Sequence, residues 1–296
     1  MDSFELNKIA GAVLGSILFI MTIGILAGMF YHTEEANPQA YAVAEAEAGG
    51  ETGGAVVEEV PFATLLAQAD TRFRVTVVEG VTSWQVWSAL NAAPFLAGDL
   101  AEVPVEGRLA PGSYEVRRGQ ERSALVAEIE ARQQAILDAA WENRAEDVPV
   151  SSPEDALILA SIVEKEAGGP RELAQVASVF YNRMANNMRF QMDATIIYGI
   201  TRGEGLLDRP IRRSDIDGVT ERQQHGSVQF NTYVIDGLPP TPIANPGRAA
   251  IEAVLNPEDT PYLFFVADGT GGHAFATTLA DHNRNVARWR EIEARP

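Results

Sequence analysis

Apolar residues recur at helical spacing in the stretch SPEDALILASIVEKEA, residues 152–167. Ser152 suits the N-cap position, because its hydroxyl oxygen can accept a backbone N–H that has no partner inside the helix. Pro153 suits the first helical position, and the acidic residues that follow it complement the positive end of the helix dipole. The pattern therefore predicts a helix that begins just after Ser152 and ends before the Gly-Gly-Pro sequence that follows the stretch.

This helix carries a carboxylate on its apolar face. The apolar stripe consists of Leu159, Ile162 and Val163, and the next position on it at helical spacing is Glu166. Glu164 lies about 200° away around the helix axis. A carboxyl group on an apolar face tends to stay protonated near neutral pH, as a general acid must. A buried glutamate that is tied to an arginine or to backbone amides would give the same pattern, and both interpretations stay open.

The other hydrophobic patterns along the chain include both the two-residue period of strands and the 3.6-residue period of helices. Strands are expected at 72–78, 111–119, 228–235, 261–267 and 274–277. Helices are expected at 82–91, 123–141, 171–188, 249–255 and 281–293, and the apolar run 194–200 fits either a strand or a helix. This mixture predicts an α+β fold, with a small α/β module at 71–120 and a mostly helical catalytic domain with a small sheet at 121–296.

The first 70 residues have a different composition. Residues 9–31 contain no charged side chain and are long enough to cross a membrane as a single transmembrane helix. Lys8 predicts that residues 1–8 are cytoplasmic and that the rest of the chain lies outside; a cleaved signal peptide is the alternative. Residues 32–70 are rich in Ala, Gly and Glu, which is typical of a flexible linker.

Charge and cysteine content exclude several classes of function. The chain has 41 acidic and 23 basic residues, a net charge of -18, which argues against a nucleic-acid partner. It contains no cysteine, so disulfides, thiolate metal sites and a cysteine nucleophile are excluded. The four histidines show no zinc-site spacing, so His273 is not expected to bind a metal. No cofactor is expected.

Five sequence blocks carry a resemblance to a known family. In chain order they are LASIVEKEA, VASVFYNRM, MRFQMDATIIYG, FNTYVIDGLPPTPIANPG and TPYLFFVADGTGGHAF. Together they resemble the MltG/YceG family of endolytic murein transglycosylases, from about Arg72 to the C-terminal end. The resemblance implies cleavage of the MurNAc–GlcNAc bond inside peptidoglycan glycan strands, with a 1,6-anhydro-MurNAc end as product. It also implies that Glu166 is the catalytic acid, which then acts as a base.

The same resemblance suggests which residues hold the sugar. The candidates fall in the family blocks and are Gln191, Asp193, Asn231, Tyr233 and His273. For each of them a structural hydrogen bond is an equally good interpretation. An enzyme of this family would sit in the bacterial inner membrane with its catalytic domain in the periplasm, and cell-wall synthesis proteins are candidate partners.

Two departures from the family leave other functions open. The acidic linker stands where family members usually carry a LysM-like region, and the N-terminal segment resembles the anchor of membrane-attached c-type cytochromes, although no haem-attachment motif follows it. The chain would then be a fusion. An inactive cell-wall-binding scaffold, associated through its membrane helix with a respiratory or cell-division complex, is the first alternative. A hydrolase that uses Asp193 as a second carboxylate is another.

Overall fold

The computed structural model describes residues 72–218 and 228–294. The predicted cytoplasmic segment 1–8, transmembrane segment 9–31 and linker 32–70 lie outside these ranges. Among the helices within them, none has both the length and the apolar character that a bilayer crossing requires.

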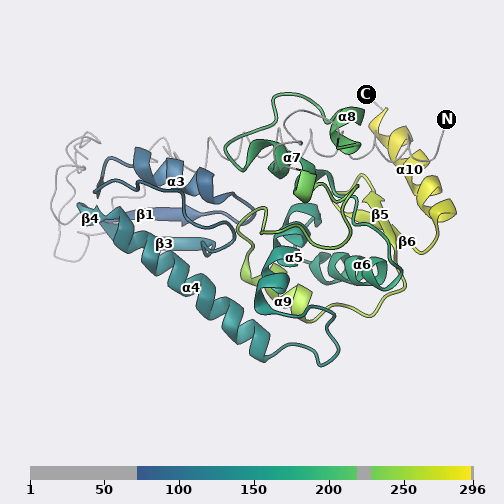
Figure 1. Ribbon diagram of the computed structural model, residues 1–296, viewed down its shortest axis with the longest axis horizontal. Coiled ribbons are helices and arrows are strands. Elements are labelled where there is room, and N and C mark those ends of the chain that lie inside the picture. Colours follow the sequence, from purple (N-terminus) through teal and green to yellow (C-terminus); the bar gives the residue numbers. More distant parts are fainter. Residues whose placement is uncertain (1–71, 219–227, 295–296) are drawn as a thin grey trace, which may run out of the picture.

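The first part of the described chain is built around one antiparallel strand pair. Strand β1 (Arg72–Val77) pairs with β3 (Gly112–Arg117), and the register places Val75 opposite Tyr114. Figure 1 shows helix α3 (Ser83–Ala92) along one side of this pair and helix α4 (Arg122–Glu142) along the other. Two short strands, β2 (Leu96–Ala97) and β4 (Gln120–Glu121), pair in parallel beside them. The predicted boundary at residue 120 falls within β4 and stays a prediction.

A buried arginine joins α4 to α3. Arg122, the first residue of α4, is 6% exposed. Its guanidinium donates to the carbonyl oxygens of Leu90 at 2.6 Å and Ala93 at 2.7 Å, which lie at the C-terminal end of α3. Carbonyl groups in the last turn of a helix have no partner within the helix, so this side chain both caps α3 and fixes where α4 starts.

Helices dominate the rest of the chain. They are α5 (Pro153–Glu166), α6 (Leu173–Ala185), α7 (Asp193–Thr201), α8 (Arg213–Ile216), the 3-10 turn η2 (Val228–Phe230), α9 (Arg248–Leu255) and α10 (Leu279–Glu293). Helix α5 packs against α6 and α9, and the antiparallel pair β5 (Phe264–Ala267) and β6 (His273–Ala276) packs against α10 at the far end of the molecule (Figure 1). The predicted α5 cap is confirmed: the Ser152 hydroxyl accepts the backbone N–H of Asp155 at 3.1 Å, and Pro153 begins the helix.

One hydrophobic core runs from the strand pair into the helices. It includes Leu90 of α3, Val116 of β3, Leu137 of α4, Leu159 of α5 and Ile251 of α9. Each of these side chains is at most 2% exposed. Helix α5 is central because all eight residues from Ala156 to Val163 are buried. The middle of this helix is therefore enclosed by packing, while its last residues, 164–166, are half-buried.

The coarse fold prediction is confirmed as a mixture of helices and small sheets, but one predicted strand is wrong. Residues 228–235 form η2 and a series of turns instead of a strand. The backbone oxygen of Asn231 accepts the N–H of Val234 at 2.9 Å and of Ile235 at 3.0 Å, so these groups bond within turns and not to a neighbouring strand. The side-chain amide of Asn231 holds the turn in place through the carbonyls of Asp215 and Ile216. The ambiguous run 194–200 is helical and belongs to α7, and the strand expected at 261–267 is limited to β5.

Candidate active site

Glu166 is the last residue of α5 and is half-buried. Burial raises the pKa of its carboxyl group from 4.5 to about 7, and the negative charge of Asp193 acts in the same direction. The positive charges of Lys165 and Arg183 oppose this shift. A carboxyl group with a pKa near neutrality holds a proton in about half of the molecules at pH 7, so it can both donate and accept one.

Asp193 and Tyr233 form a hydrogen-bonded pair beside Glu166. The Tyr233 hydroxyl donates to Oδ1 of Asp193 at 2.8 Å. Burial raises the pKa of Asp193 to about 6, and the bond from Tyr233 opposes that shift. Burial and the Asp193 charge raise the pKa of Tyr233 well above its usual value, so its hydroxyl stays a donor. Two carboxyl groups whose charges interact do not both ionise easily, and the proton stays on the one with the higher pKa, which is Glu166.

Arg183 provides a fixed positive charge near this pair of acids. It lies on α6 and is 6% exposed. Its Nε donates to the Leu263 carbonyl at 2.7 Å and one terminal nitrogen donates to the Phe190 carbonyl at 2.7 Å. Burial lowers its pKa to about 10, which still leaves it charged at neutral pH. The guanidinium therefore fixes the segment before α7 to the start of β5.

The segment that carries Gln191 is held against the segment that carries Tyr233. Gln191 has a φ of 58°, and its N–H donates to the Thr232 carbonyl at 3.1 Å. The next N–H, from Met192, donates to the Thr232 hydroxyl at 2.9 Å. A positive φ is uncommon for a residue other than glycine. These bonds hold Gln191 beside the Asp193–Tyr233 pair.

Asn231 is placed differently from the other candidates. Its side chain is 0% exposed. Its amide nitrogen donates to the carbonyls of Asp215 at 2.9 Å and Ile216 at 3.0 Å, and its amide oxygen accepts the N–H of Tyr233 at 3.0 Å. All of its polar atoms therefore have partners inside the protein, and the side chain supports the loop that presents Tyr233.

His273 is the first residue of β6 and lies near the end of α5. Its Nδ1 is 2.7 Å from Oε2 of Glu172, and its backbone N–H donates to Oε1 of the same carboxylate at 2.8 Å. The Gly168 N–H also donates to Glu172, at 3.2 Å. One carboxylate thus joins the residue two positions after Glu166 to the first residue of β6. The structure therefore places His273 near the end of the helix that carries Glu166, with its ring bonded to Glu172.

Three further polar residues that the sequence did not single out as functional interact with one another near the end of α5. The Lys165 ammonium donates to the Gly80 carbonyl at 3.2 Å. Burial lowers the pKa of Lys165, and the negative charges of Glu164, Glu166 and Glu106 oppose that shift. Glu106 is half-buried, and burial raises its pKa. Tyr198 donates a hydrogen bond to Glu106. The alternating charges of the sequence Glu-Lys-Glu were the available signal, but only the fold shows what each of them faces.

Metal binding has no support in this region. Within 72–218 and 228–294, no three or more His, Cys, Asp or Glu side chains are grouped so that they could hold a metal ion.

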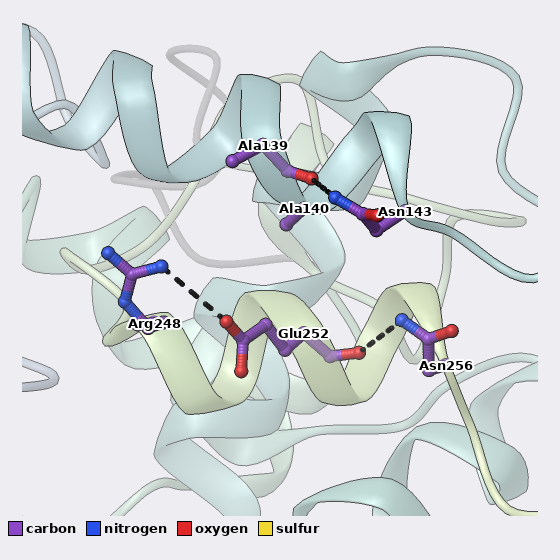
Figure 2. A pocket seen from close by; sticks show the side chains of 6 residues that line it. All are labelled: Ala139, Ala140, Asn143, Arg248, Glu252 and Asn256. Atoms are coloured by element: carbon purple, nitrogen blue, oxygen red, sulfur yellow. Dashed lines mark hydrogen bonds and ion pairs between the residues drawn. The ribbon is translucent and has the colours of Figure 1, made fainter.

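A hollow of about 470 Å³ lies elsewhere, between α4 and α9 (Figure 2). It is lined by Ala139, Ala140, Asn143, Arg248, Glu252 and Asn256. Its polar contacts are local to each helix: Asn143 donates to the Ala139 carbonyl at 2.7 Å, and Arg248 pairs with Glu252 at 3.6 Å (Figure 2). None of the acids around Glu166 lines this hollow, so the site is assigned by its chemistry and not by the size of a cavity.

Comparison with known proteins gives relatives with consistent names. Over 181 residues, 61% of this chain, it is 30% identical to an endolytic murein transglycosylase of Bacillus subtilis. Over 189 residues, 63% of this chain, it is 30% identical to an endolytic murein transglycosylase of Streptococcus pneumoniae. These matches cover 47% and 32% of the two relatives, so this chain spans about half of their length or less.

The fold has a solved counterpart. A crystal structure of a YceG-like protein from Listeria monocytogenes matches with a TM-score of 0.55 and 25% sequence identity, over 72% of this chain and 75% of that one. The model of the YceG-like family matches residues 56–288, which is most of the chain and includes every candidate residue described above. The chain therefore belongs to the YceG-like family.

Proposed function

We propose that this chain is an endolytic murein transglycosylase, a lyase that cleaves peptidoglycan glycan strands internally. Family membership and the names of the two relatives support the substrate and the reaction class. The observation that carries the proposal is the half-buried Glu166 at the end of α5, whose pKa is raised to about 7 beside a second acid. Such a group suits a reaction in which one carboxyl group first gives and then takes a proton.

The proposed reaction needs only one acid. The protonated Glu166 donates its proton to the glycosidic oxygen as the bond between C1 of MurNAc and that oxygen breaks. The resulting carboxylate then takes the proton of the MurNAc 6-hydroxyl as that oxygen bonds to C1. Glu166 ends protonated, no water is consumed, and the product carries a 1,6-anhydro end. Ordinary glycoside hydrolysis differs because it uses a second carboxylate as nucleophile or base.

The neighbours of Glu166 have separate roles in this proposal. The negative charge of Asp193 keeps the proton on Glu166 before cleavage, and it faces the positive charge that develops on the sugar ring. Tyr233, Gln191 and His273 contact the sugar. Asn231 acts indirectly, because its buried amide fixes the backbone of Tyr233.

The test is the identity of the products. Purified full-length chain is incubated with glycan strands of peptidoglycan beside two variants, Glu166→Gln and Glu164→Gln, and the ends are identified by mass. Glu164 is the matched control because it lies on the same helix turn but accepts the Gly247 N–H at 2.9 Å. We expect anhydro ends from the parent and from Glu164→Gln, and none from Glu166→Gln.

The position of Asp193 favours one competing function, hydrolysis with two carboxylates. Its charge reaches Glu166 strongly enough to raise the pKa of that residue, which a second catalytic acid would also do. The same experiment separates the two, since hydrolysis leaves a reducing end. Reducing ends would replace the transglycosylase proposal. No cleavage by a folded parent would favour a cell-wall-binding scaffold.

We also propose that residues 9–31 anchor the chain in the inner membrane and place the catalytic domain on the periplasmic side. The support is the uncharged run of these residues and the cell-wall substrate named for the relatives. Full-length chain should stay with the membrane fraction after an alkaline carbonate wash. Its release by that wash would contradict an integral anchor.

A further inference from the structure

Lys165, which directly precedes the proposed acid, reaches across to the first part of the chain. Its ammonium donates to the backbone carbonyl of Gly80, 85 residues earlier, at 3.2 Å. Gly80 lies in the turn between β1 and α3. The approach is close along the whole side chain, because a Cβ added to Gly80 would lie 3.5 Å from Cδ of Lys165 and 3.5 Å from Cγ of Glu164.

This turn is fixed from its other side by a buried amide. The Gly80 N–H donates to the Asn245 carbonyl at 2.9 Å, and the Asn245 N–H donates to the Val81 carbonyl at 2.8 Å. The Asn245 side chain is 0% exposed and donates to the same Val81 carbonyl at 3.0 Å. Gly80 itself has a φ of 73°, which favours glycine. The carbonyl that receives Lys165 therefore has a defined position.

Two of the three carboxylates that face Lys165 are engaged elsewhere. Glu164 accepts the Gly247 N–H at 2.9 Å, and Glu106 accepts the Ser83 N–H at 2.8 Å. The third is Glu166. The ammonium is thus held by a neutral carbonyl. Burial lowers the pKa of Lys165, while the charges of Glu164, Glu166 and Glu106 favour its charged form.

We propose that Lys165 is a positioning residue for the reaction. The Gly80 turn holds its ammonium beside Glu166, so the first part of the chain helps to determine how readily Glu166 releases its proton. This inference rests on the proposed function. It assigns to the region before α5 a role in the chemistry itself, in addition to any role in holding the substrate.

The physical consequence is a balance of charges around Glu166. Asp193 favours the protonated form, while Lys165 and Arg183 favour the carboxylate. Tyr233 also faces this group and stays neutral, since its pKa is raised. Around Lys165 the facing groups are Glu164, Glu106 and Glu166, with Glu79 acting on Glu164 and Tyr198 on Glu106. Removal of the ammonium leaves Asp193 less opposed and raises the pKa of Glu166.

The test is the pH profile of cleavage by the full-length chain. A general acid works while it is protonated, so activity falls as the pH rises through its pKa. Lys165→Met should move this alkaline limb upward by about one pH unit, and Lys165→Arg should restore it toward the parent position. An unmoved limb in Lys165→Met, with only a uniform loss of rate, would overturn the inference.

A glycine pair tests the role of the turn. Gly80→Ala keeps every charge but strains the turn at its positive φ, so it should move the limb in the same direction as Lys165→Met, by less. Gly119→Ala is the matched control, because Gly119 has a φ of 76° in another turn and no atom within 4 Å of an added Cβ. Equal profiles for the two alanine variants would overturn the role of the Gly80 turn. If Lys165→Met fails to fold, Lys165→Arg and Gly80→Ala carry the test.

A second readout separates this inference from the proposed function. The Glu166 carboxyl can be titrated by ¹³C NMR, with Glu166→Gln identifying its signal, whether or not the chain cleaves glycan. A higher pKa in Lys165→Met and Gly80→Ala than in Gly119→Ala supports the inference even if no cleavage is found. Loss of cleavage with unchanged titration would reject the inference and leave the proposed function to the product analysis.

Discussion

The hollow between α4 and α9 and the acid cluster at the end of α5 are both polar, but they are polar in different ways. In the hollow, each polar side chain is satisfied by a residue of its own helix, and the Arg248–Glu252 pair is more than half exposed on both sides. In the cluster, Glu166, Asp193 and Tyr233 come from separate segments and act on one another while partly removed from water.

This difference shows which structural feature identifies a candidate functional site. Water screens the charges in the hollow, so each side chain there behaves as it would on any helix surface. Partial burial leaves the charges of the cluster less screened, and the proton affinity of each acid depends on its neighbours. Coupling between buried groups from distant parts of the chain is therefore a better guide here than the volume of a depression.

The largest expected effect concerns the acid itself. Glu166→Gln should lower the rate of glycan cleavage by about 10³-fold or more, because it removes the proton donor but preserves the shape. Glu164→Gln, on the same turn, should stay within about tenfold of the parent. The measurement is the initial rate of release of soluble fragments. Similar losses in both variants would mean that the two faces of α5 do not differ as described.

The next effect concerns the buried amide that holds the Gly80 turn. Asn245→Ala should lower the free energy of unfolding by about 2–4 kcal/mol, because several buried N–H and carbonyl groups lose a partner. Asn256→Ala is the control from the hollow, where the exposed side chain makes one contact with the Glu252 carbonyl at 3.4 Å. It should cost less than about 0.5 kcal/mol. Denaturant unfolding of both variants at one pH decides the comparison.

Partial burial of Glu166 should make the free energy of unfolding depend on pH. The pKa of Glu166 is higher in the folded chain, about 7, than its ordinary value of 4.5. The folded state is therefore favoured while this group is protonated, and that contribution is lost as the pH rises through 7. Glu166→Gln avoids the loss and should be more stable than the parent by about 2 kcal/mol at pH 8.5, with little difference at pH 4.

Unfolding curves at these two pH values measure this effect. A stability difference that is equal at both would show that the charge on Glu166 is not the cause.

A smaller effect tests the sign of the coupling inside the cluster. Asp193→Asn removes the negative charge that raises the pKa of Glu166. The alkaline limb of the pH–rate profile should therefore move down by about one unit, opposite to the shift expected for Lys165→Met. Movement of both variants in the same direction would contradict the charge balance around Glu166.

The smallest effect is expected in the hollow. Arg248→Ala removes an exposed pair between residues four apart on α9, which contributes about 0.3–0.5 kcal/mol at most. Neither the cleavage rate nor the pH profile should change measurably. A clear loss of activity would give the hollow a role in binding and would weaken the contrast drawn above.

Local patterns were sufficient to predict most of the fold. The Ser152 cap and the apolar stripe of α5 follow from side-chain chemistry within a few residues, and the structure confirms both. The same reasoning failed at 228–235, where alternating residues resemble a strand. There the amide of Asn231 bonds to Asp215 and Ile216, which are about 15 positions away, and no local pattern reveals such contacts.

The candidate site also contains one residue whose position the sequence could predict and others whose roles it could not. The position of Glu166 on the apolar stripe could be found by counting residues, because the helix is regular. Arg183 and Lys165 could not be assigned, since their importance depends on the carbonyls of Phe190, Leu263 and Gly80 that receive them. Asn231 was proposed as a sugar contact, and only its complete burial shows that its amide is occupied within the protein.

The carboxylate of Glu172 has a consequence for the order in which the molecule is completed. It accepts the backbone N–H groups of Gly168 and of His273, and His273 lies 101 positions after Glu172 in the chain. The cap and the apolar stripe of the helix that carries Glu166 are local, but the contacts that join Gly168, Glu172 and His273 form only once the C-terminal hairpin is present. A chain still emerging from the ribosome, or cut short before β6, would thus possess the acid without its finished surroundings. Completion of the last strand is then the event that gives the proposed acid its finished surroundings.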